Sequence, residues 1–168
     1  MKSIYILIVL LLFQIGCSGS KEAWDNARQT DTINSYEKYL EEYPNSDFSK
    51  EAREILDRLY EKKAWDKARL SDNISSYEEF IILFPQSQLK NTALERIKEI
   101  KIDKFWEQTR NRNTIESYND FILLYPNSKY ESIAKEKLNG LIELKNWNEI
   151  LSKNNLDDYY NFISKYPQ

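Results

Sequence analysis

The chain has 168 residues, of which 41% are apolar, 14% aromatic and 30% charged, with a formal net charge of -3. This mild acidity, with both signs interspersed, argues against a surface for nucleic acid or anionic membranes. The sequence contains no histidine, which excludes histidine-based catalytic dyads, imidazole acid–base chemistry and histidine-ligated metals. The apolar and aromatic content is ample for a packed domain, and the presence of only three glycines favours an all-α protein.

The first 17 residues are typical of an export signal. Lys2 precedes an apolar run from Ile4 to Phe13, and small residues follow that run. The run is much shorter than the roughly 20 residues that span a bilayer as a helix. We therefore expect a signal peptidase to cut near residue 17 and place the protein outside the cytoplasm.

Cys17 is the only cysteine in the chain. Gly16-Cys17 resembles the lipobox of bacterial lipoproteins, with Gln14 where that pattern prefers leucine. The resemblance implies that Cys17 is acylated and anchors the protein to the outer membrane, facing the periplasm or the cell surface. The alternative is ordinary cleavage after Ser18 or Ser20, which would release a soluble periplasmic protein. Neither case leaves a second cysteine for a disulfide or a thiolate metal site.

Beyond the signal, the sequence repeats with a period of 41 residues. The tryptophans and the prolines both keep this interval: Trp24, Trp65, Trp106 and Trp147, and Pro44, Pro85, Pro126 and Pro167. A period of this size indicates supersecondary units that bury their apolar faces by stacking. We predict a single α-solenoid domain over residues 18–168, with units at about 30–70, 71–111 and 112–152 and a half-unit at 153–168.

Each unit is predicted to hold a short helix and a long helix. The short helix begins at a polar cap and ends before the repeated proline. Its expected caps are Thr32, Asn73, Thr114 and Asn155, or the preceding Asp31, Asp72, Asn113 and Asn154. The long helices are expected at about residues 47–69, 88–110 and 129–151, capped by Ser46, Ser87 and Ser128.

Apolar side chains at helical spacing predict the core of each unit. In the first short helix they are Tyr36, Tyr39, Leu40 and Tyr43, and equivalent residues recur in every unit. This recurrence favours core packing over ligand stacking, because every unit has the same face to bury. The predicted repeat core comprises Trp24, Trp65, Trp106, Trp147, Tyr36, Tyr77, Tyr118 and Tyr159. Small Ala52, Ala93 and Ala134 would let the long helices approach closely.

A small residue, an aromatic residue and a proline recur as Ser35, Tyr39 and Pro44 and at the equivalent positions of later units. This pattern resembles the second helix of a tetratricopeptide (TPR) repeat, A-x3-F…P. The usual TPR period is about 34 residues, and the long helix would absorb the additional two turns. The W-x2-L-G signature is absent, since Asp66, Lys67 and Ala68 follow Trp65. A HEAT-type repeat has a fitting period but matches the short, proline-closed helix less well.

The turn Tyr43-Pro44-Asn45-Ser46 and its counterparts, with the signal at Cys17, also resemble a group of TPR-like lipoproteins. These act in outer-membrane β-barrel assembly and cell-division coordination. The resemblance implies a non-catalytic scaffold that binds protein partners and has no cofactor, metal or small-molecule substrate. Catalysis is not expected from the acidic pairs Glu41-Glu42 and Asp157-Asp158, because adjacent residues of a helix point apart.

The last half-unit leaves Tyr159, Phe162 and Tyr166 without the long helix that follows their counterparts. Three explanations compete: the short helix caps the solenoid, its exposed face binds a partner or a second copy, or the sequence is a piece of a longer protein. The main functional hypothesis is thus an envelope scaffold. Its alternatives are a repeat module of, or accessory subunit to, a larger envelope enzyme, and a purely structural envelope protein. A catalytic domain encoded in frame past codon 168 would favour the enzyme module.

Overall fold

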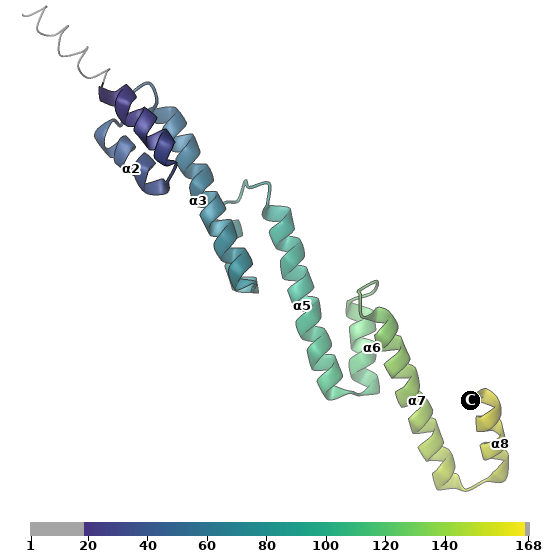
Figure 1. Ribbon diagram of the computed structural model, residues 1–168. Coiled ribbons are helices and arrows are strands. Elements are labelled where there is room, and N and C mark those ends of the chain that lie inside the picture. Colours follow the sequence, from purple (N-terminus) through teal and green to yellow (C-terminus); the bar gives the residue numbers. More distant parts are fainter. Residues whose placement is uncertain (1–18, 167–168) are drawn as a thin grey trace, which may run out of the picture. The chain divides into compact units, whose positions relative to one another are not determined.

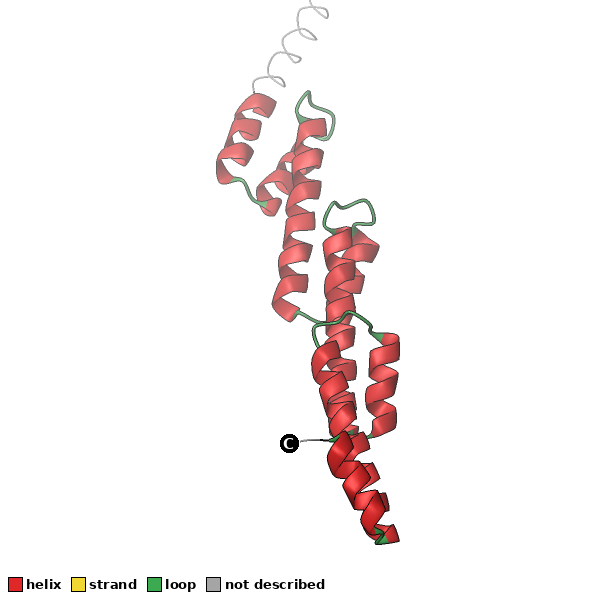
Figure 2. Ribbon diagram, turned by 90° about the vertical axis from the view of Figure 1, so that its right-hand side faces the viewer, coloured by secondary structure: helices red, strands yellow, loops and turns green. Residues whose placement is uncertain are grey.

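The computed structural model describes residues 19–166, which form helices joined by turns and contain no strand (Figures 1 and 2). The prediction of an all-α fold is confirmed. Contacts divide the chain into two compact units, Met1–Ala93 and Leu94–Gln168. No helix within the described residues is both long enough and apolar enough to cross a membrane.

Short and long helices alternate in both units. The first unit holds helical residues 19–30, α2 (Ile33–Glu42), α3 (Ser49–Ser71), α4 (Ile74–Leu83) and the start of α5 (Lys90–Arg112). The second holds the rest of α5, α6 (Ile115–Leu124), α7 (Glu131–Lys153) and α8 (Leu156–Lys165). Helices α2, α4, α6 and α8 have 10 residues each, and α3, α5 and α7 have 23. The long helices begin and end two residues later than predicted.

The turn from a long helix into the next short helix is built the same way each time. The long helix ends on an Asp or Asn in the left-handed conformation, where these residue types are tolerated better than most. A tyrosine hydroxyl five residues later donates a hydrogen bond to its side-chain oxygen, at 3.0 Å from Tyr36 to Asp31 and 3.1 Å from Tyr118 to Asn113. These Asp and Asn residues therefore end the long helices, and the alternative prediction that they cap the short ones is wrong.

The short helices are capped by the residues predicted first. Thr32, Asn73 and Thr114 each accept a hydrogen bond from a backbone N–H three residues on, and the Oγ of the serine there accepts one from the backbone N–H of the cap. In the last unit Asn155 accepts from Asp157 N–H instead, because Asp158 replaces that serine. The serine hydroxyl also reaches the preceding long helix, as when Ser117 Oγ donates to Thr109 O at 3.3 Å. The capping boxes thus tie short helices to long ones.

The predicted serine caps of the long helices are wrong. Phe48 and Tyr130 occupy the cap positions of α3 and α7 and make no side-chain capping hydrogen bond. Ser46 instead shares hydrogen bonds with the Tyr39 hydroxyl and with Ser49 Oγ, at 2.5 and 2.8 Å. The remaining serines also precede their helices: Ser87 accepts from Leu89 N–H, and buried Ser128 Oγ has no partner among the described residues.

Each of the two compact units buries an aromatic layer under the start of a long helix. In the first, Trp24, Tyr36 and Tyr39 pack with Ala52 of α3. In the second, Trp106, Tyr118 and Phe121 pack with Ala134 of α7. The three alanines Ala52, Ala93 and Ala134 are 0% exposed. Close approach of the helix backbone at these alanines closes the layer.

The eight predicted core residues divide into two groups. Five are buried, namely Trp24, Trp106, Tyr36, Tyr77 and Tyr118. Three are half-buried, namely Trp65, Trp147 and Tyr159. Leu89 directly precedes α5, the long helix that follows the short helix after Trp65. Phe48 and Tyr130 stand at the equivalent positions before α3 and α7, and each places an aromatic ring there.

We predict that Ala134→Leu lowers the free energy of unfolding by about 1–3 kcal/mol, because the added atoms have no space in a closed layer. Urea unfolding followed by circular dichroism measures the change. Ser132→Leu, at an exposed position of the same helix, is the matched control and should change stability by less than about 0.5 kcal/mol. Equal effects of the two substitutions would contradict the packing described.

Candidate functional site

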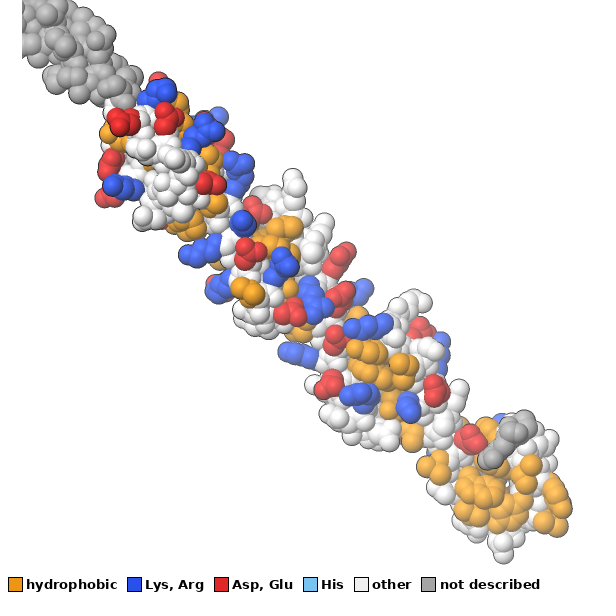
Figure 3. Space-filling model, in the orientation of Figure 1, with side chains coloured by type: hydrophobic (Ala, Val, Ile, Leu, Met, Phe, Trp, Pro, Cys, Tyr) orange, Lys and Arg blue, Asp and Glu red, His pale blue; other side chains and the backbone are white. Residues whose placement is uncertain are grey.

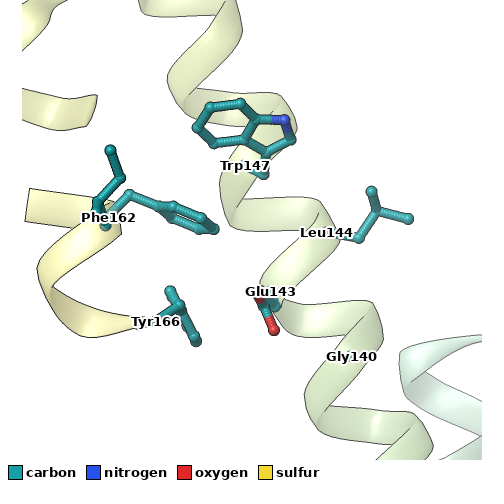
Figure 4. A pocket seen from close by; sticks show the side chains of 7 residues that line it. Gly140, Glu143, Leu144, Trp147, Phe162 and Tyr166 are labelled. Atoms are coloured by element: carbon teal, nitrogen blue, oxygen red, sulfur yellow. The ribbon is translucent and has the colours of Figure 1, made fainter. Parts of the chain in front are cut away.

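An apolar groove lies between α7 and α8. It has a volume of about 620 Å³, and its lining residues are Gly140, Glu143, Leu144, Trp147, Phe162, Ile163 and Tyr166. In Figure 4 the rings of Trp147, Phe162 and Tyr166 lie around the space between the two helices, and Leu144 lies on the other side of α7. Hydrophobic side chains are also concentrated on the surface at this end of the molecule in Figure 3.

The aromatic residues of the groove repeat an arrangement found in the other units. The ring centroids of Trp147 and Phe162 are 5.1 Å apart, the same distance as between Trp106 and Phe121. Tyr159 lies 5.8 Å from the Trp147 ring. The local hairpin is therefore formed as in the preceding unit, and the same side chains face the same direction.

The α7–α8 layer differs from the layers of Trp24 and Trp106 in having no ring stacked on its tryptophan. Phe48 stacks on Trp24 with an interplanar angle of 8°, and Tyr130 stacks on Trp106 with one of 10°. Among residues 19–166, the rings close to Trp147 are only tilted or edge-on to it. One face of the indole is thus left for another group.

Exposure shows how far the layer is open. Phe162 is half-buried, whereas the equivalent Phe80 and Phe121 are 1% and 0% exposed. Ile163 is 61% exposed, whereas the equivalent Ile122 is half-buried. Apolar surface of this kind is costly to leave in water, so its cover by another molecule would be favourable.

Two groove residues differ in character from those at the same positions of earlier units. Gly140 stands where Arg58 and Glu99 stand, and a Cβ added there would meet open space. Leu144 stands where Lys62 and Asp103 stand. Both changes remove a charge, and the first also removes a side chain. At these two positions the lining of the last groove is therefore uncharged, unlike that of its counterparts.

The contacts of Asp103 show what the charge absent at Leu144 does in the preceding repeat. Asp103 Oδ1 lies 2.7 Å from Lys129 Nζ and accepts a hydrogen bond of 3.0 Å from the Tyr130 hydroxyl. The hydrogen bond from Lys129, with a smaller contribution from that of Tyr130, holds the pKa of Asp103 below its usual value. Leu144, at the equivalent position of α7, has no polar side-chain atom that could accept such hydrogen bonds.

Sequence reasoning identified part of this site. It singled out Tyr159, Phe162 and Tyr166 as less covered than their counterparts, but it did not single out Gly140 and Leu144. A comparison of each repeat position across units would have found both. Cys17, the predicted lipidation site, lies outside the described residues. Within residues 19–166 no cluster of three or more acidic or cysteine side chains has the geometry of a metal site.

Comparison of the chain with protein-family models, curated proteins and solved structures found no match.

Phe121→Ala and Phe162→Ala form a matched pair that tests whether the groove is open. We expect Phe121→Ala to cost about 3–5 kcal/mol of stability, because that ring is fully buried. The half-buried Phe162 should cost only about 1–2 kcal/mol. Urea unfolding of both variants by circular dichroism measures the difference. A cost for Phe162→Ala as large as that for Phe121→Ala would show that the layer is already closed.

Proposed function

We propose that this chain is a non-catalytic protein-binding scaffold, attached to the bacterial cell envelope through a lipid on Cys17. The observation that carries the proposal is the α7–α8 groove, an open aromatic layer at a position where earlier units have a helix. A groove of this kind suits a helix, because the layers around Trp24 and Trp106 are closed by the starts of α3 and α7.

Two features of the sequence support the rest of the proposal. The signal pattern that ends at Cys17 favours export and acylation, which would place the groove outside the cytoplasm. The chain also has no histidine, and no nucleophile with an adjacent base can be named from its residues. Compared with catalysis, binding to a protein partner is the function for which these residues offer a physical basis.

We further propose that the repeated hairpins stack as a TPR-like α-solenoid. The 41-residue period and the recurring layer of aromatic residues and alanine support this arrangement. In a solenoid each unit contacts only its neighbours, and the apolar face of one unit is buried against the next.

Cys17→Ala tests both the anchor and the scaffold. We expect the native chain in the membrane fraction of intact cells, cross-linked to one stoichiometric envelope protein. The variant should leave that fraction and lose most of the cross-linked partner, because its concentration near the membrane falls. Ser18→Ala, which keeps the cysteine, is the control and should behave as the native chain. Recovery of no partner with any of the three forms would contradict the scaffold function.

A further inference from the structure

We propose that two copies of the chain associate through their first units, with the exposed face of α4 of each copy lying in a basic groove along α3 of the other. The groove and the α4 face both belong to the unit Met1–Ala93. This association requires neither a lipid on Cys17 nor the α7–α8 groove.

The α3 groove lies along the second half of α3, beside the start of α2, and has a volume of about 640 Å³. Leu59 and Leu70 supply apolar surface to it. Three lysines also line the groove against a single acidic residue, so its net charge is positive: Lys62, Lys63 and Lys67, with Asp66.

The side chains of the α3 groove are available to another molecule. Leu70 is 88% exposed, and leaving so much apolar surface in water is unfavourable. Lys62 and Lys63 are also exposed, and neither makes an ion pair within residues 19–166. A segment that is both apolar and acidic would therefore complement the groove.

The repeated fold does not require these residues. At the positions of Lys62 and Leu70, α5 carries Asp103 and Asn111, yet it forms a helix of the same 23 residues. The basic and apolar character of the α3 groove is thus particular to the first unit. A contact with a second molecule accounts for residues that the hairpin itself does not need.

The exposed face of α4 has the complementary chemistry. Glu78 and Ile82 lie four residues apart on one face of this helix, and Ile82 is 77% exposed. Glu79 adds a second negative charge, and α4 contains no basic residue. Its 10 residues span about 15 Å, close to the roughly 17 Å between the levels of Leu59 and Leu70 along α3.

The α4 helix cannot enter the α3 groove of its own chain. Lys67 Nζ lies 3.0 and 2.9 Å from the two carboxylate oxygens of Glu79, and the Trp65 and Phe80 rings are 5.0 Å apart. These contacts hold α4 at the side of α3. A second copy presents the same α4 face without this restriction. In a two-fold pair each copy gives and receives one α4, so the contact forms twice.

Sedimentation equilibrium of the protein, purified in a mild detergent at matched solvent density, tests the association. We expect the mass to rise from one chain to two with increasing protein concentration. Leu70→Asn and Ile82→Glu should each weaken the association about tenfold or more, because each removes apolar contact. Asn111 and Glu41 already occupy the equivalent positions, so both variants suit the repeated fold.

A charge exchange tests which two surfaces meet. Lys63→Glu and Glu78→Lys should each weaken the association about fivefold or more, because like charges then face each other. The two changes in one chain should recover most of the native affinity. Lys98→Glu, at an exposed position of α5, is the matched control and should leave the affinity unchanged. Circular dichroism checks that each variant stays folded.

Four outcomes would overturn the proposal. They are a mass of one chain at every concentration, assemblies larger than two copies, association that Leu70→Asn or Ile82→Glu does not weaken, and a double charge variant that associates no better than either single one.

Discussion

The structure depends on one constraint: the aromatic layer of a hairpin is buried only when the start of a following long helix closes it. Short helices of 10 residues have little stability of their own and need this packing. Alanine at the contact, as in Ala52 and Ala134, allows the long helix to come close enough. An aromatic residue four positions earlier then covers the tryptophan. Burial, helix stability and the exposure of the α7–α8 groove all follow from whether this layer is complete.

The turns keep the layer in register. A left-handed Asp or Asn ends each long helix, and a core tyrosine donates a hydrogen bond to it, as Tyr36 does to Asp31. Desolvation by burial, followed by this hydrogen bond, raises the pKa of Tyr36, so its hydroxyl stays protonated as a donor. The tyrosine thus joins the core to the turn. In the last unit the matching distance from Tyr159 to Asn154 is 3.4 Å, and the serine of the capping box is absent. The least covered layer also has the weaker turn.

The repeat made much of this fold predictable, because one pattern is seen several times in a single sequence. The all-α class, the short-helix caps and the burial of residues such as Trp24 and Tyr118 follow from spacing and residue type. The serine caps did not, because Ser46 bonds to Tyr39 and the helix begins after the next turn. The sequence also predicted less cover for Tyr159 and Phe162, which are half-buried in the structure. The sequence did not show that the change from Asp103 to Leu144 removes a hydrogen-bond acceptor, because this requires the contact between Asp103 and the Tyr130 hydroxyl.

Hydrogen exchange of the protein, read by mass spectrometry, tests the central claim most directly. Amides of α6 lie under a closed layer, and those of α8 lie under an open one, although both helices have 10 residues and similar aromatic faces. The account predicts exchange in α8 that is faster than in α6 by at least tenfold, because local opening costs less where fewer apolar contacts are lost. Equal protection of the two helices would contradict it.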